Sequence, residues 1–96
     1  MQRTGSMQKK LIESSDEFRA AGEFYRYLLT ALGFGDLTMR HEERAFVYQW
    51  HFKIDDRHLS AEHSVTDIEF RQSRFLGDRA RAVAARWKRE IKESQR

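Results

Sequence analysis

The ten residues AFVYQWHFKI, at positions 45–54, decide the fold class of this chain. Their side chains alternate between two faces with a period of two, which is the pattern of a β-strand with one face in the core and the other in solvent. The expected core face consists of Phe46, Tyr48, Trp50, Phe52 and Ile54, and the expected outer face of Val47, Gln49, His51 and Lys53. A strand with two such different faces belongs to an antiparallel sheet that is covered on one side.

A second strand is expected just before this one. Leu37, Met39 and His41 alternate in the same way, and residues 42–44 would form the tight connection between the two strands. On the other side of the central strand, residues 55–58 form a second turn candidate.

The stretch that follows, residues 59–75, allows two interpretations. Ser64, Thr66, Ile68 and Phe70 alternate as a third strand would. Thr66 and Glu69, however, also have the spacing of a capping box, which would open a helix instead. We favour the strand, because a clearer helix begins later, so residues 62–72 are the part of the chain whose structure the sequence decides least.

Helices are expected on both sides of the strands. Ser14 and Glu17 have capping-box spacing, and Gly33 or Gly35 can end the helix that follows. A second helix is expected from Asp78, a candidate N-cap, because the residues after it are strong helix formers. Its apolar residues fall on one narrow face that should pack on the core: Leu76, Ala80, Val83, Ala84, Trp87 and Ile91. The predicted fold class is therefore α+β: a helix, a three-stranded antiparallel sheet and a helix (αβββα), with both helices on one face of a single sheet.

The chain is short enough for one domain, with 96 residues. We expect that domain to span residues 14–96 and to follow a flexible N-terminal segment at residues 1–13. Within that segment, residues 1–6 resemble a cloning remnant, because Gly5-Ser6 precedes a second methionine, Met7.

The first helix has an apolar arc wider than a single sheet would cover. Phe24 and Tyr27 lie on an extra stripe beside the main one. They must be covered by the second helix, by a second copy of the chain or by a partner protein. Aromatic residues also dominate the energetics of protein interfaces. The candidate partner-binding residues are Phe24, Tyr27, Tyr48 and Trp50.

Charge is divided unevenly along the chain. Residues 1–70 hold 9 Lys or Arg against 12 Asp or Glu, whereas residues 71–96 hold 9 against 3. Several of the later bases fall on one arc of the last helix, a layout found in proteins that bind nucleic acid, although it also serves solubility. The candidate nucleic-acid-binding residues are Arg74, Arg81, Lys88, Arg89 and Lys92.

Catalytic and metal-binding chemistry has little support in the sequence. The chain has no cysteine, so it can form neither a disulfide nor a thiolate zinc site. No serine lies in a nucleophile elbow, and no glycine-rich loop precedes a helix. Four histidines, His41, His51, His58 and His63, have no metal-ligand spacing and are expected at the surface. We therefore expect no enzyme activity, no cofactor and no metal.

Two functions remain. The first is a small non-catalytic regulator or inhibitor that binds a protein partner, with a homodimer as one form of that association. The second is a nucleic-acid-binding protein that uses the basic face of its last helix. No apolar run is long enough to cross a membrane and no signal peptide is recognisable, so a cytoplasmic location is expected.

Overall fold

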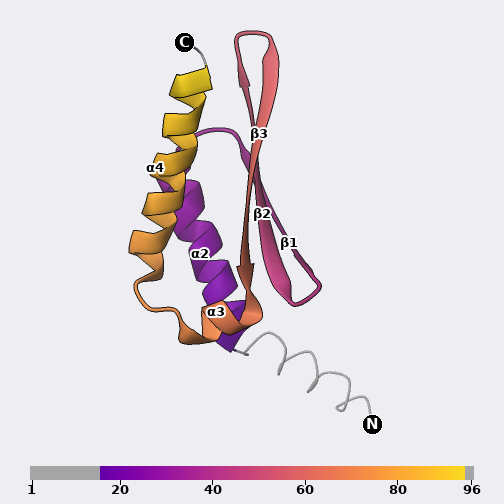
Figure 1. The fold of residues 1–96 in the computed structure, drawn as a ribbon, viewed down its shortest axis with the longest axis vertical. Coiled ribbons are helices and arrows are strands. Elements are labelled where there is room, and N and C mark those ends of the chain that lie inside the picture. The colour runs from indigo at the N-terminus through magenta and orange to yellow at the C-terminus, as the bar shows by residue number, and fades with distance from the viewer. Residues whose placement is uncertain (1–15, 95–96) are drawn as a thin grey trace.

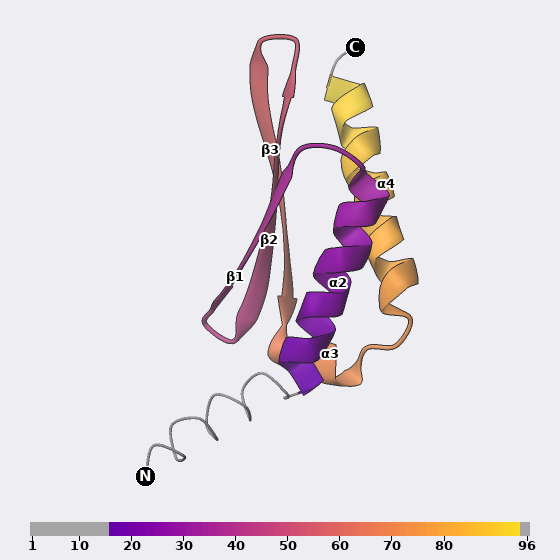
Figure 2. The ribbon, with the colours of Figure 1, turned by 180° about the vertical axis from the view of Figure 1, so that it is seen from behind.

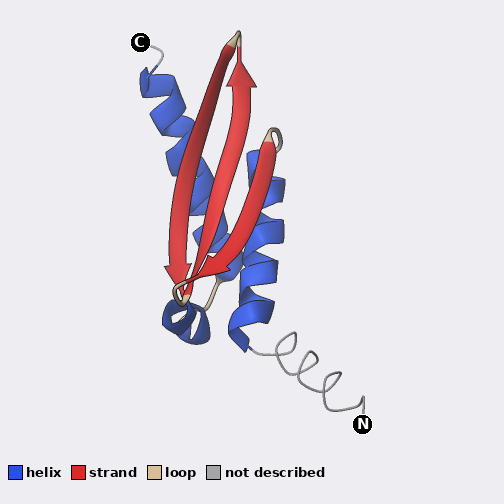
Figure 3. Cartoon of the chain, turned by 90° about the vertical axis from the view of Figure 1, so that its right-hand side faces the viewer, coloured by secondary structure: helices blue, strands red, loops and turns tan. Residues whose placement is uncertain are grey.

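The computed structural model describes residues 16–94 and confirms the α+β fold class. Its elements follow the order α2 (Asp16–Leu32), β1 (Asp36–Glu42), β2 (Ala45–Ile54), β3 (Arg57–Thr66), α3 (Asp67–Gln72) and α4 (Leu76–Ser94). The three strands form one antiparallel sheet in the order β1-β2-β3, and α2 and α4 lie side by side on one face of it (Figures 1, 2 and 3). The segment at residues 1–13 and the capping residue Ser14 lie outside the described residues.

Tight turns set the register of the sheet. Glu43 and Arg44 both have positive φ, which matches the two-residue hairpin turns that follow the twist of paired strands. Asp55 also has positive φ in the turn between β2 and β3. Asp36, the first residue of β1, pairs with His51, so β2 and β3 continue together past the start of β1.

The core lies between the sheet and the two long helices. The core face predicted for the central strand is confirmed, because Phe46, Tyr48, Trp50 and Phe52 are buried. The predicted face of the last helix is confirmed as well, with Ala80, Val83, Ala84 and Trp87 buried. Val47 differs from expectation: it is buried on the outer face, where it lies between Arg40 and Ser64 of the neighbouring strands.

Two tyrosines tie α2 to the sheet by hydrogen bonds to backbone carbonyls. Tyr25 Oη donates to the carbonyl of Leu37 over 2.7 Å, and Tyr48 Oη donates to the carbonyl of Ala21 over 2.8 Å. Gly33 ends the helix as predicted: it has a φ of 79° and its amide donates to the carbonyl of Leu29. These bonds place α2 over β1 and β2.

The strand predicted to run to Phe70 ends at Thr66, so that prediction was wrong. Thr66 accepts from the amide of Glu69 through its hydroxyl, and the Glu69 carboxylate accepts from the amide of Thr66. This reciprocal capping box opens α3, because it satisfies amide groups that a helix start leaves without partners. Phe70 still enters the core, but from a helix instead of a strand.

The start of the last helix also differs from expectation. α4 begins at Leu76, and the amide of Arg79 donates to the carbonyl of Phe75 over 3.1 Å. Phe75 therefore occupies the capping position that was predicted for Asp78, which lies in the first turn. α4 then runs in the same direction as α2 (Figures 1 and 2).

Candidate functional site

Of the four aromatic residues predicted to bind a partner, the structure leaves one at the surface. Phe24, Tyr48 and Trp50 are fully buried, whereas the side chain of Tyr27 is 45% exposed. Phe24 packs against Tyr48 with ring centroids 5.1 Å apart, and Trp50 stacks on Trp87 at 5.8 Å. The three buried rings hold the fold together, and Tyr27 is the member of the set that a partner can reach.

Burial also determines the chemistry of Tyr48. Desolvation raises the pKa of its phenol well above the ordinary value, so the hydroxyl stays protonated. In this state it remains the donor of the hydrogen bond to the Ala21 carbonyl. Tyr48 therefore has a structural role and does not serve as an acid or base near neutral pH.

Phe75 is an exposed aromatic residue that the sequence did not single out. Its side chain is 76% exposed, and its φ of 59° lies in the left-handed region. A bulky residue with positive φ is a rare outlier, and such backbone strain costs about 1–3 kcal/mol. No local sequence signal marks it, because the conformation arises from the junction between α3 and α4.

Tyr27 of α2 lies beside the first turn of α4, which directly follows Phe75 in the chain. A Cβ added to Gly77 would meet Tyr27 Cδ1 at 3.6 Å and the guanidinium of Arg81 at 3.4 Å. Arg74 and Phe75 come directly before this turn of the helix, and both are exposed. We call this group the aromatic–arginine surface: Tyr27, Arg74, Phe75 and Arg81.

The basic residues predicted to bind nucleic acid have different environments. Lys88 is half-buried, and its Nζ donates to the carbonyl of Ala31 over 2.8 Å. A cation at the end of a helix is favourable, so Lys88 stabilises the contact between α4 and the C-terminal end of α2. Arg81 forms an exposed ion pair with Asp78 one turn away. Arg74, Arg89 and Lys92 are exposed and have no ion pair with another residue in the range 16–94.

A groove runs between the free end of the β2–β3 hairpin and the C-terminal half of α4. It has a volume of about 580 Å³ and is open to solvent. Its walls combine apolar side chains with charged ones: Phe52, Leu59, Ser60, Ala61, Glu62, Arg86, Trp87, Glu90, Ile91 and Ser94.

The four histidines do not converge on one site. His41 contacts the carboxylate of Asp67 at 2.8 Å, and His51 and His58 are exposed on β2 and β3. His63 differs from the surface position expected for it, because it is half-buried between β3 and α4. Among residues 16–94, no group of three or more His, Cys, Asp or Glu side chains could hold a metal ion.

Within the same part of the chain, every helix is too short or too polar to span a lipid bilayer. Comparisons with protein-family models, with curated proteins and with solved structures found no match for this chain.

Proposed function

We infer that this protein is a small non-catalytic regulator or inhibitor that binds a protein partner through the aromatic–arginine surface. The observation that carries this proposal is Phe75, whose ring is exposed while its backbone is held in the left-handed region. Strained residues of this kind gather at binding and switch sites, where the surrounding structure maintains them. A partner that covers this exposed ring removes apolar surface from water, which contributes favourable binding free energy.

The composition of the surface indicates the chemistry of the partner. Aromatic residues and arginine are the residue types that contribute most to interface energetics, and both types occur here. Arg74 supplies positive charge directly beside Phe75, and Arg81 adds a second cation, which is paired with Asp78. The complementary partner is therefore an acidic protein segment with an apolar or aromatic anchor.

A second copy of the chain is a poor match for this particular surface. A symmetric dimer brings the same patch of both subunits together. Arg74 and Arg81 of both subunits would then lie in one interface, and like charges brought together across an interface are unfavourable. The homodimer stays a prediction for other surfaces, and the partner proposed here is a different protein.

The first experiment selects short random peptides that bind the immobilised protein and measures their affinity by fluorescence anisotropy. We expect the selected peptides to combine acidic residues with an aromatic or aliphatic anchor. Replacing both Tyr27 and Phe75 with alanine should weaken binding at least tenfold, about 1.4 kcal/mol, because the ring contacts are lost. Raising the salt concentration should also weaken binding, since it screens the arginines.

The matched control replaces Leu29 and Met39 with alanine, since these residues are similarly exposed but lie outside the aromatic–arginine surface. This control should bind like the wild-type protein, and circular dichroism should show the same fold for both variants. Equal peptide affinity for the wild-type protein and the Tyr27→Ala/Phe75→Ala variant would contradict the proposal.

Nucleic-acid binding is the second candidate function. Its support is the pair Arg89 and Lys92, which are exposed on α4 and have no ion pair with another described residue. Cations of this kind bind phosphates without reading base sequence, and such binding weakens steeply with salt. Lys88 is less suited to this role because it is bound to the Ala31 carbonyl.

We expect titrations of labelled single-stranded DNA, duplex DNA and duplex RNA with the protein, at low and moderate salt, to detect this nucleic-acid binding. Replacing Arg89 and Lys92 with glutamate should then abolish binding through charge repulsion with the phosphates. The variant Lys53→Glu/Arg57→Glu changes the net charge equally on another, exposed part of the molecule, so it should retain most of the affinity. Equal losses in the two variants would reject α4 as the binding face.

A further inference from the structure

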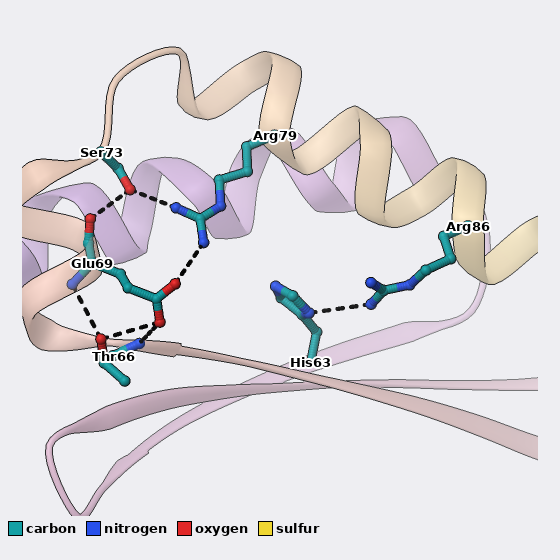
Figure 4. A network of polar contacts seen from close by, with 6 residues as sticks. All are labelled: His63, Thr66, Glu69, Ser73, Arg79 and Arg86. Atoms are coloured by element: carbon teal, nitrogen blue, oxygen red, sulfur yellow. Dashed lines mark hydrogen bonds and ion pairs between the residues drawn. The ribbon is translucent and has the colours of Figure 1, made fainter.

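His63 on β3 forms a hydrogen bond with Arg86 of α4, next to a separate network in which Thr66, Glu69, Ser73 and Arg79 join α3 to α4 (Figure 4). An Nη2 hydrogen of Arg86 points at His63 Nδ1, and the two nitrogens are 3.2 Å apart. Because a guanidinium only donates, Nδ1 must accept this hydrogen bond and carry no proton. The neutral ring therefore has its proton on Nε2, which is buried and has no hydrogen-bond partner.

The groups around His63 come from every element packed against it. Arg86 and Arg79 approach from α4, and Glu69 from α3. The ring of Phe24 on α2 stacks on the imidazole at 6.2 Å, and Tyr48 is its register partner on β2. Two of these charged neighbours are cations and one is an anion.

The anion among these neighbours, Glu69, already has other hydrogen-bond partners. The Glu69 carboxylate accepts from Arg79 Nη2 over 3.0 Å and from the Thr66 amide over 3.0 Å (Figure 4). The Thr66 hydrogen bond and the Arg79 guanidinium hold the pKa of Glu69 below its usual value, so it keeps its charge for these partners. A positive charge on His63 would have little compensation from this carboxylate.

We propose that His63 is an acid-sensitive latch whose protonation at Nδ1 releases Arg86 and loosens α4 from β3. The added proton occupies the lone pair that accepts from Arg86, so the hydrogen bond is lost. It also places an imidazolium beside a guanidinium, and like charges at this distance repel each other. The hydrogen bond between His63 and Arg86 directly joins the middle of α4 to β3.

Loosening at this point reaches the groove described above. Arg86 is one of its lining residues, and Trp87 and Leu59 form apolar parts of its walls. When Arg86 leaves His63, the hydrogen bond that joins β3 to α4 beside the groove is lost, and α4 can separate from the hairpin. The latch thereby couples proton uptake to exposure of apolar surface between α4 and the hairpin.

The direction of the pH dependence follows from the environment of the ring. Burial lowers the pKa of His63 below its ordinary value of 6.5, and Arg86 and Arg79 lower it further, while Glu69 acts weakly in the opposite direction. In the unfolded chain the ring titrates at its ordinary value, so the unfolded state binds a proton first as the pH falls. Above pH 6.5, neutral His63 contributes its full share to the stability of the folded state. This contribution is lost as the pH falls from 6.5 toward the lowered pKa that His63 has in the folded protein.

The test measures urea unfolding between about pH 7.5 and pH 5, the range in which histidine titrates. NMR of the imidazole Cε1–H signals follows His63 directly. We expect the unfolding midpoint of the wild-type protein to fall as the pH falls, and His63→Gln to lose most of this dependence. His58→Gln is the control: His58 is exposed on the same strand, so the variant should keep the wild-type pH dependence.

A second variant, Arg86→Gln, retains an N–H donor but removes the nearby charge, so it should raise the midpoint of the His63 titration. In the wild-type protein, the Trp87 indole signal should shift with the same midpoint as the His63 titration, because Trp87 follows Arg86 on α4 and moves when protonated His63 releases that helix. A wild-type His63 that titrates at or above 6.5, or a Trp87 signal that is independent of its titration, would overturn the latch. These readouts remain usable if His63→Gln fails to fold.

Discussion

Replacing Trp87 with alanine should lower the free energy of unfolding by about 3–5 kcal/mol, the usual cost of removing a large buried aromatic side chain. Trp87 is 2% exposed and stacks on Trp50 with an angle of 11° between the rings. This stacking is a main contact between α4 and the central strand. Its removal leaves a cavity that the rigid strand cannot fill, because the backbone of β2 is paired on both sides.

Urea unfolding followed by far-ultraviolet circular dichroism measures this loss without relying on tryptophan fluorescence. Arg89→Ala is the control on the same helix, because Arg89 is exposed and its replacement should change stability by less than about 0.5 kcal/mol. If Trp87→Ala changed the free energy of unfolding as little as this control, α4 would not pack on the sheet as described.

The second large effect is expected at Gly35, where alanine should destabilise the protein by about 3 kcal/mol, from backbone strain and steric overlap together. Gly35 has a φ of 81°, which side chains rarely adopt. An added Cβ would lie 2.6 Å from Trp50 Nε1 and 2.7 Å from the carbonyl oxygen of His51. The backbone around Gly35 would have to shift, and Trp50 Nε1 would lose its hydrogen bond to the Phe34 carbonyl.

Gly33 provides the matched control for this prediction. Its φ of 79° is almost the same, but no atom lies within 4 Å of a Cβ added there. Gly33→Ala should therefore lower the free energy of unfolding only by the cost of a left-handed backbone conformation, about 1–2 kcal/mol. Thermal and urea unfolding of both variants separate backbone strain from steric overlap, and equal losses would show that the close approach at Gly35 is unimportant.

These two predictions concern residues that are distinct from the aromatic–arginine surface. Tyr27 and Phe75 are largely exposed, so their replacement should affect binding more than stability. The separation makes the functional proposal testable on folded protein. A variant that lost peptide binding together with its circular dichroism signal would say nothing about that surface, which is why the folding control accompanies it.

Several features could be predicted from the sequence because their causes are local. The alternation of residues 45–54 indicates a two-faced strand, since successive side chains of a strand point in opposite directions. Gly33 ends the first helix because glycine adopts positive φ without steric cost. The buried face of the last helix follows from the helical repeat in the same way.

The predicted end of the third strand was wrong, and the reason for this error is also local. Thr66 at the helix N-cap has an extended backbone, with φ of −73° and ψ of 158°. The same residue can therefore end a strand and cap a helix, and alternation of side chains does not distinguish the two. The hydrogen bond from the Asp67 amide to the Arg44 carbonyl, a contact between distant parts of the chain, accompanies the change of direction.

The candidate site could be predicted only in part, because burial depends on what packs above each residue. Phe24 and Tyr27 have similar positions on the apolar arc of the first helix. The core covers Phe24 with Tyr48 and Phe70, whereas Tyr27 lies at the margin of α4 beside Gly77. Lys88 likewise belongs to the basic arc by sequence, but it binds a carbonyl of α2 because the two helices lie side by side.

By itself, the sequence determined the fold class, the faces of the central strand and the last helix, and the excess of positive charge after residue 70. Only the tertiary structure decided which aromatic rings remain exposed, which cations are free of partners and which histidine is buried beside arginines. Helical and strand periodicities act over a few residues and can be seen in a linear sequence. Exposure and electrostatic environment depend on contacts between residues far apart in the chain, and these exist only after the helices have packed on the sheet.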